Sequence, residues 1–140
     1  MMAAIPRSIS VGLTLGLVLA LALGCVRTWS ADGEWLGHRD VPVTGLDPAV
    51  AKSLGLVKLT IRDGRFELLE AGIPKEGSVR YDPDRALLHV EKYMGRPMDQ
   101  AAKGIRENNV PLEIKPGPDG TMLFHDPKGF DREPLVLKKG

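Results

Sequence analysis

Three histidines are the first residues to consider for chemistry, because an imidazole can act as a base, a proton shuttle or a metal ligand. They stand at His38, His89 and His125, far apart and without the His-x-His or His-x-x-x-His spacing of common metal sites. Strands that are distant in sequence can converge in a barrel, so a three-histidine site stays open as an alternative. We favour independent histidines on the surface or at strand ends, and therefore predict neither a bound metal nor a cofactor.

Nucleophiles and paired carboxylates are also poorly represented. Beyond the first 24 residues the serines are Ser30, Ser53 and Ser78, and none lies in the Gly-x-Ser-x-Gly pattern of a nucleophile elbow. The acidic stretches 82–84 and 126–133 lack the alternating acidic residues and central glycine of a calcium-binding loop, and are more typical of turns. The sequence therefore predicts no catalytic residues, and we expect a protein that is not an enzyme.

The only cysteine, Cys25, directly follows an apolar segment that begins near the N-terminus. Residues 1–7 carry one positive charge, at Arg7, whereas residues 8–24 are uncharged and rich in leucine. A basic start followed by an apolar region is the pattern of a signal peptide, and the run is slightly short for a membrane-spanning helix. We predict a signal peptide over residues 1–24.

Residues 21–25 read Leu-Ala-Leu-Gly-Cys, which resembles a bacterial lipobox, where the cysteine thiol receives diacylglycerol and becomes the first residue after cleavage. The resemblance implies lipidation at Cys25 and anchoring of the exported protein to the cell envelope. The alternative is an ordinary cysteine of an apolar segment. Acyl chains contribute about 0.8 kcal/mol per buried methylene, so two or three chains hold a small domain on a membrane. In this family an aspartate after the cysteine often signals inner-membrane retention, so Val26 favours the outer membrane in a host that has one.

The expected tether between the anchor and the folded domain is short. Residues 25–32 contain no long linker rich in serine or proline. At 3.3–3.6 Å per residue, the eight steps from Cys25 to Gly33 reach about 25–30 Å. We therefore expect the domain to lie close to the bilayer, with its partner or ligand at the same membrane.

Composition limits the remaining possibilities. The chain has 140 residues, 43% of them hydrophobic and 26% charged, which is typical of one folded domain. Because 19 Lys and Arg residues are balanced by 18 Asp and Glu residues, no basic surface for nucleic acid is predicted. A single cysteine also excludes an intramolecular disulfide.

From Gly33 onward the pattern is one of short strands separated by turns. Residues 56–62 and 65–68 alternate apolar and polar side chains, as half-buried strands do. Asp63-Gly64 lies between them and predicts a tight hairpin, because both residues tolerate the positive φ of a type I′ turn. Further strands are expected at 34–38, 77–81, 86–94, 112–115, 121–125 and 134–139.

About eight strands in little more than 100 residues predict an all-β domain over residues 33–140, an antiparallel up-and-down barrel with one or two short helices. The helices are expected at 47–55, with Asp47 as N-cap and Pro48 at its first position, and at 98–107. Val50, Leu54 and Leu56 are spaced to lay one helix face on a sheet, and short helices between strands often close the end of a barrel. The side chains expected to point inward are Val57, Leu59, Ile61, Phe66, Leu68, Val79, Tyr81, Leu88, Val90, Leu112, Ile114, Leu123 and Leu137.

Gly33-Glu34-Trp35 at the first strand, followed by this meander, resembles a lipocalin-like barrel carried by a bacterial lipoprotein. In lipocalins the tryptophan of Gly-x-Trp closes one end of the barrel and packs under a basic residue from the last strand. The resemblance implies that Trp35 is a structural plug, with Lys138 as the nearest basic candidate. The alternative is that Trp35 is an ordinary core residue.

Two functions follow from these observations. The first is a membrane-anchored, non-enzymatic module that binds a protein or another component of the cell envelope. The second, implied by the lipocalin resemblance, is a carrier of a small apolar ligand whose binding residues the sequence does not identify. A carrier should contain a contiguous internal cavity, whereas an interaction module should have a packed core and an exposed apolar patch. We favour the packed core, because a domain of this size needs most of its apolar side chains to fill its interior.

Overall fold

The computed structural model describes residues 29–42, 44–129 and 131–140. The predicted signal peptide and Cys25 lie outside the described residues. The strands are β1 (Gly33–His38), β2 (Leu56–Arg62), β3 (Arg65–Glu70), β4 (Ile73–Tyr81), β5 (Ala86–Tyr93), β6 (Arg96–Pro97), β7 (Leu112–Pro116), β8 (Met122–His125) and β9 (Leu135–Lys139). The helices are α1 (Pro48–Gly55) and α2 (Lys103–Glu107), with 3₁₀ turns η1 (Met98–Gln100) and η2 (Pro118–Gly120).

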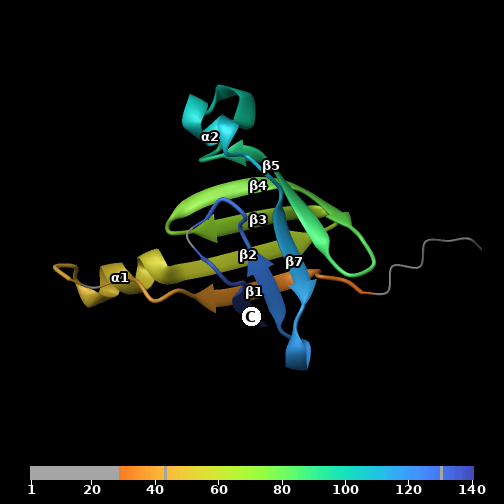
Figure 1. Ribbon diagram of the computed structural model, residues 1–140, viewed down its shortest axis with the longest axis horizontal. Helices are drawn as coiled ribbons and strands as arrows, with labels where there is room; N and C mark the ends of the chain where they lie inside the picture. The colour runs from red at the N-terminus through yellow and green to blue at the C-terminus, as the bar shows by residue number, and fades with distance from the viewer. Residues whose placement is uncertain (1–28, 43, 130) are drawn as a thin grey trace, which may run out of the picture.

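Eight of the strands close into an antiparallel barrel, which confirms the predicted fold class (Figure 1). The order around the barrel is β1-β2-β3-β4-β5-β7-β8-β9, and β9 pairs again with β1. Each strand therefore pairs with its neighbours in sequence, apart from the short β6, which pairs only with β5 among the described strands. Closure removes the free sheet edges that an open sheet of this size would expose.

The β2–β3 hairpin forms where the sequence predicts it. Asp63 and Gly64 have φ values of 52° and 72°, so both central residues adopt the positive φ of the expected turn. The turn sets the register Val57–Glu70 through Arg62–Arg65 between the two strands. That register places the alternating apolar residues of both strands on the same, inner face.

The β4–β5 seam depends on a glycine. Gly77 lies at a register shift beside Glu76, and a Cβ atom at Gly77 would overlap the carbonyl oxygen of His89. The missing side chain lets the two backbones approach closely at this irregularity. Strand β4 also starts four residues earlier than the predicted 77–81, because a turn at Ala71 and Gly72 returns the chain directly from β3.

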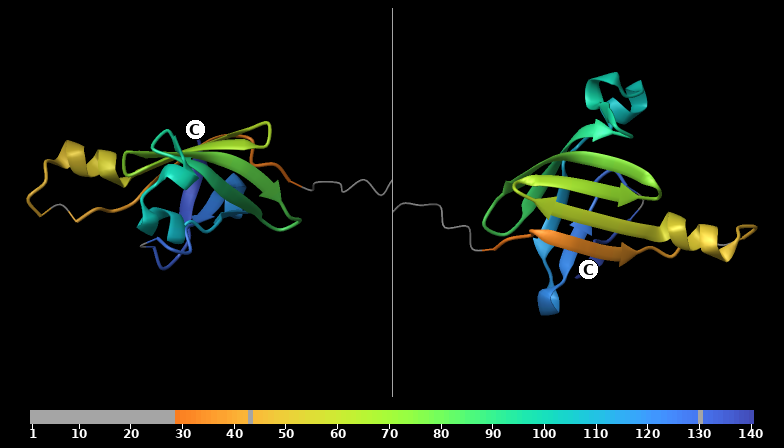
Figure 2. Two further views of the ribbon diagram at one scale, coloured as in Figure 1. Left: turned by 90° about the horizontal axis from the view of Figure 1, so that it is seen from above. Right: turned by 180° about the vertical axis from the view of Figure 1, so that it is seen from behind.

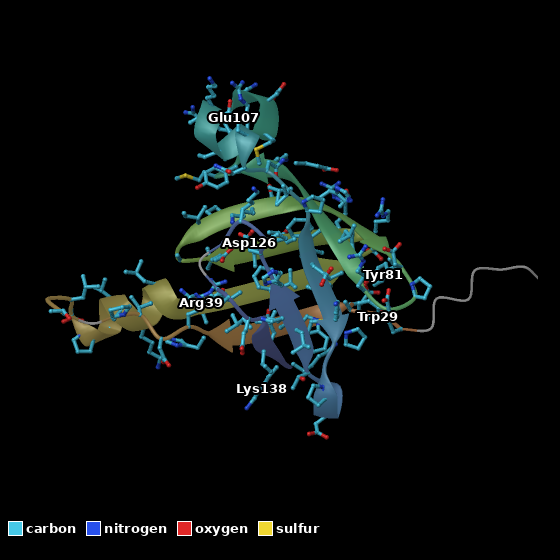
Figure 3. All side chains as sticks on the ribbon, in the orientation of Figure 1. Trp29, Arg39, Tyr81, Glu107, Asp126 and Lys138 are labelled. Atoms are coloured by element: carbon cyan, nitrogen blue, oxygen red, sulfur yellow. The ribbon has the colours of Figure 1, made fainter. Side chains whose placement is uncertain are left out.

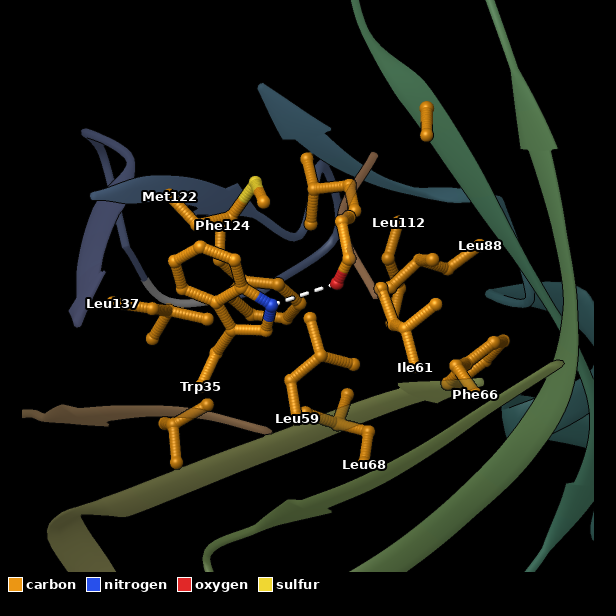
Figure 4. Close-up of a cluster of buried hydrophobic side chains, with 14 of the residues drawn as sticks. Trp35, Leu59, Ile61, Phe66, Leu68, Leu88, Leu112, Met122, Phe124 and Leu137 are labelled. Carbon is orange, nitrogen blue, oxygen red and sulfur yellow. Dashed lines mark hydrogen bonds between the residues drawn. The ribbon is translucent and has the colours of Figure 1, made fainter. Parts of the chain in front are cut away.

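The barrel interior is filled by side chains (Figure 4). Its largest fully buried members are Phe66, Phe124, Leu59, Ile61, Leu68, Leu88, Ile114, Met122, Leu137 and Val57. One inward prediction is wrong: Leu123 is only half-buried, and its neighbours Met122 and Phe124 point inward instead. A shift of one residue exchanges the two faces of a strand, and three consecutive apolar residues in β8 left the choice open.

The short helices differ from the predictions. Helix α1 begins at Pro48 after the Asp47 N-cap, as expected, but Val50 and Leu54 are exposed and Leu56 is the first residue of β2. The reason is that α1 projects beyond the barrel instead of lying on its sheet or closing its end (Figures 1 and 2). The expected helix 98–107 is divided, because Ala101 and Ala102 are extended between η1 and α2.

Successive turns of a meander alternate between the two ends of the barrel. The short-turn end, as we name it, carries the β2–β3, β4–β5 and β7–β8 turns together with the start of β1 and the end of β9. The loop end carries the β3–β4 turn and the longer β1–β2, β5–β7 and β8–β9 connections. The described N-terminal segment joins the short-turn end, whereas α1 projects from the loop end (Figure 2).

Candidate functional site

Trp35 lies at the short-turn end, where the first and last strands meet. Only 6% of its surface is exposed, and its Nε1 donates a hydrogen bond of 2.8 Å to the carbonyl oxygen of Ala31 (Figure 4). The Nζ atom of Lys139 lies 4.4 Å from the centroid of the tryptophan ring and donates to the carbonyl oxygen of Asp32 at 2.7 Å. The ammonium group of Lys139 therefore lies over a buried indole ring at this end of the barrel, as in a cation–π contact.

The basic residue over Trp35 is Lys139, so the expectation of Lys138 is wrong. In the β1–β9 register, Trp35 is opposite Lys139 and Leu36 is opposite Lys138. Residues directly opposite each other in an antiparallel pair share one face of the sheet. Lys139 therefore accompanies the inward tryptophan, whereas Lys138 accompanies the half-exposed Leu36 on the outer face.

Residues 29–32 pack against the same end of the barrel. Trp29 donates from Nε1 to the carbonyl oxygen of Asp82 at 3.2 Å, and its ring meets Tyr81 edge-to-face with centroids 5.3 Å apart (Figure 3). The backbone N–H of the fully buried Ala31 donates to the Tyr81 hydroxyl at 3.2 Å. The expected tether is therefore attached to the barrel from Trp29 onward. This attachment cannot be predicted from the position of Trp29 in the sequence alone.

The loop end contains a partly open cavity of about 160 Å³. Its walls come mainly from β5, β7 and the β5–β7 connection, with further residues from β4 and the β8–β9 connection. A hydrogen bond from the Asn109 side chain to the carbonyl oxygen of Val90 holds the β5–β7 connection to the barrel. The lining residues are Lys75, Val90, Tyr93, Met98, Ile105, Asn108, Asn109, Val110, Leu112, Asp126 and Lys128. The lining combines apolar and polar side chains, as small-molecule sites do, but the volume is below the roughly 300 Å³ at which ordinary ligand pockets begin.

Ion pairs join three connections at the loop end. Arg39 contacts Glu70 at 2.7 Å and Asp131 at 2.6 Å, and Lys75 contacts Glu70 at 3.2 Å. Arg39 follows β1 and Glu70 ends β3. Lys75 lies near the start of β4, and Asp131 precedes β9. The cluster is mostly buried and holds the loops in place, so we assign it a positioning role.

The perturbed carboxylates lie on the outside of the barrel. Partial burial would raise the pKa of Glu113, but hydrogen bonds from Arg85 and Lys115 outweigh it and lower that pKa. The hydrogen bond from Arg65 lowers the pKa of Glu91, and the bond to Glu113 raises the pKa of Arg85. Both carboxylates are thus held in their charged form, the opposite of what a general acid requires.

The histidines and acidic turns considered in the sequence lie in separate surroundings. The His38 ring donates from Nε2 to the carbonyl oxygen of Lys52 at 3.0 Å, whereas His89 and His125 belong to β5 and β8. Asp126 accepts from the backbone N–H of Lys128 at 2.9 Å, as expected for a turn residue. Among the described residues no group of three or more His, Cys, Asp or Glu side chains is placed to hold a metal ion.

Comparisons with protein-family models, curated proteins and solved structures found no match for this chain. Within the described part of the chain, no helix has the length and apolar character needed to cross a bilayer.

Proposed function

We propose that this protein is an exported lipoprotein, anchored to the cell envelope by lipid on Cys25, whose barrel is a non-enzymatic binding or interaction module. The anchor rests on the lone cysteine directly after the apolar segment 8–24. In a host with two membranes, Val26 after the cysteine favours the outer one.

The filled interior is the observation that supports an interaction module over a carrier. Phe66, Phe124 and Leu59 are among the large side chains that occupy the centre of the barrel with less than 2% of their surface exposed. Protein interiors of this kind pack as densely as organic crystals, so they leave little room for a ligand. Large apolar side chains are exposed instead at the surface, including Leu36, Val50 and Met94. Recognition would therefore use the outer surface and the loops.

The position of Trp29 indicates how the anchored barrel would be oriented. Trp29 lies four positions after Cys25, and four steps along the chain reach at most about 13–14 Å. Because Trp29 is attached to the Asp82 carbonyl at the short-turn end, that end would face the bilayer. The loop end, with α1 and the cavity, would then be available to partners away from the anchor.

Membrane fractionation of the full chain tests the anchor. The wild-type protein should be found in the membrane fraction and require detergent for release, whereas Cys25→Ser should give an unprocessed or soluble product. Ser30→Ala serves as the matched control, because it changes an exposed residue of the same segment and keeps the cysteine. Unchanged membrane association of Cys25→Ser, with no acyl mass on the wild-type protein, would contradict the proposal.

The cavity at the loop end supports a second candidate, the carriage of a small apolar molecule. The cavity volume of about 160 Å³ is close to the roughly 150 Å³ of an engineered apolar cavity that binds benzene. Binding of a single-ring apolar compound should be lost in Ile105→Trp, which fills the cavity, and retained in Lys103→Trp on the exposed face of α2. Isothermal titration calorimetry with benzene and indole measures this binding, and no heat of binding to the wild-type protein would contradict the carrier function.

A further inference from the structure

Residues 29–32, which we name the strap, are fixed to the short-turn end of the barrel along their whole length. At the start of the strap, the Trp29 indole donates to the Asp82 carbonyl at 3.2 Å and meets the Tyr81 ring edge-to-face. The backbone N–H of the fully buried Ala31 donates to the Tyr81 hydroxyl at 3.2 Å. Side chains of β1 and β9 donate to the last two carbonyl oxygens of the strap. The described chain is therefore joined to the barrel from its first residue.

The strap shortens the free chain between the proposed anchor and the barrel. Without the strap contacts, the eight steps from Cys25 to Gly33 would reach about 25–30 Å, whereas the four steps to Trp29 reach at most about 13–14 Å. An α-helix with its side chains is already about 10–12 Å across, and a domain of about 100 residues has a radius of gyration near 13 Å. This tether therefore leaves no room for a folded protein domain between Trp29 and the bilayer.

Two turns beside Trp29 form the corner of the barrel that this tether brings to the bilayer. The β4–β5 turn follows Tyr81 directly, and the β2–β3 turn is joined to β4 by a hydrogen bond of 2.9 Å from the Val79 N–H to the Gly64 carbonyl. Trp29 and Tyr81 lie at this corner, where the described chain begins, whereas α1 projects from the other end of the same sheet (Figures 1 and 3).

The side chains of this corner suit the headgroup layer of a bilayer. Trp29 and Tyr81 are both half-buried, so part of each residue stays exposed there. Tryptophan and tyrosine are enriched at the level of lipid headgroups, because each ring combines an apolar body with a polar group. Residues 80–85 contain two arginines and two aspartates, and residues 62–65 contain two arginines and one aspartate. The corner therefore has no strong charge of either sign, and its contact with lipid does not require anionic headgroups.

We propose that the strap holds this corner, formed by Trp29, Tyr81 and the β2–β3 and β4–β5 turns, in contact with the headgroup layer of the bilayer. The inference rests on the proposed anchor at Cys25 and deepens it, since the lipid supplies the attachment and the strap converts that attachment into one orientation. Because anchor and corner belong to one molecule, the second contact is intramolecular and is effective even when it is weak by itself. The loop end, with α1, is thereby held away from the bilayer.

Quenching by nitroxides on lipid headgroups tests this contact. The full chain is purified from its original host and reconstituted into phosphatidylcholine vesicles that contain the labelled lipid. A fluorophore is attached through Asp84→Cys in the β4–β5 turn or, as the control, through Lys52→Cys on α1; both positions are exposed, and the only other cysteine, Cys25, is blocked by the proposed acylation. The seven residues of β2 separate the two ends by about 20 Å, so we expect quenching at position 84 to be at least about threefold stronger. Equal quenching at positions 84 and 52 would overturn the inference.

Two variants test the strap itself. An insertion of about twelve glycine and serine residues between Thr28 and Trp29 keeps the strap contacts and raises the average span of the tether to roughly 20–24 Å. Trp29→Ala instead removes the indole contacts. Each change should lower quenching at position 84 by at least about twofold, whereas Lys138→Ala, on the outer face of β9, should leave it unchanged. Undiminished quenching in the insertion variant, whose folded domain is unaltered, would overturn the inference.

Flotation of the same vesicles reports the anchor separately. A wild-type protein that does not float with the vesicles fails the proposed function and this inference with it. A protein that floats, but is quenched equally at positions 84 and 52, fails this inference alone.

Discussion

Lys139 covers the ring of Trp35 with its ammonium nitrogen 4.4 Å from the ring centroid, and so joins the last strand of the barrel to the first. The same ammonium group donates to the carbonyl oxygen of Asp32. Gly33, two residues before the tryptophan, makes this possible: a Cβ atom there would lie 2.5 Å from the lysine Nζ. The glycine and the tryptophan of the Gly-x-Trp sequence thus form one structural unit with Lys139.

Removal of the indole ring tests whether Trp35 closes the barrel. Because the side chain is buried among core residues and satisfies its N–H through Ala31, Trp35→Ala should lower the free energy of unfolding by about 3–5 kcal/mol. Urea denaturation measures this loss, with the exposed neighbour Leu36→Ala as the control. A loss below about 1 kcal/mol would place Trp35 outside the core.

The two C-terminal lysines should differ in their effect on stability. Lys139→Met removes the charge over Trp35 and the bond to Asp32, and should cost about 0.5–1 kcal/mol. Lys138→Met, on the outer face, should leave the free energy of unfolding within about 0.5 kcal/mol of wild type. The reverse order of the two effects in urea denaturation would contradict the β1–β9 register.

Gly77 should not tolerate a side chain. The Cβ atom of Gly77→Ala would overlap the His89 carbonyl oxygen and push β4 away from β5, so we expect a loss of about 2–4 kcal/mol. Gly104→Ala is the matched control, because no atom lies within 4 Å of its Cβ position and alanine is the better helix former. Thermal unfolding should therefore show a lower midpoint for the first variant and an equal or higher one for the second; equal midpoints would contradict the close seam.

Glu113 should make the barrel less stable in acid. Because its pKa is lower in the folded protein than in the unfolded chain, its contribution is fully present above the unfolded value of about 4.5 and disappears as the pH falls through the folded value. Glu113→Gln should therefore be less stable than wild type by about 1 kcal/mol at pH 7, and the difference should shrink on acidification. Glu67→Gln, on an exposed position of β3, is the control. If Glu113→Gln and wild type differ in free energy of unfolding by the same amount at pH 7 and pH 3, the hydrogen bonds from Arg85 and Lys115 do not have this role.

Much of the barrel could be predicted from local patterns. Alternation over residues 56–68 and the Asp63-Gly64 pair determine one hairpin, since both the faces and the turn are specified by adjacent residues. The predictions failed where local patterns are ambiguous. The apolar run of β8 allows two registers, so its pattern alone predicts the wrong face for Leu123, and only pairing with β7 and β9 decides between them.

The features of the two barrel ends depend on contacts between distant residues. Lys139 and Lys138 are equivalent in sequence, and the register with Trp35 alone separates them. The attachment of Trp29 to Asp82 spans 53 positions, and the cavity forms only when the β5–β7 connection folds over the barrel mouth. Helix α1 has the composition of a helix that packs on a sheet, so its projection from the loop end could not be predicted from its spacing.

Native mass spectrometry of the full-length protein, extracted in detergent from the membranes of its original host, tests the lipid anchor and the filled interior together. We expect the mass of residues 25–140 plus acyl chains on Cys25, with no further mass that denaturation removes. A chain that retains residues 1–24, or one that lacks acyl groups, would contradict the anchor. A reproducible additional mass that disappears on denaturation would contradict the packed interaction module and favour a carrier.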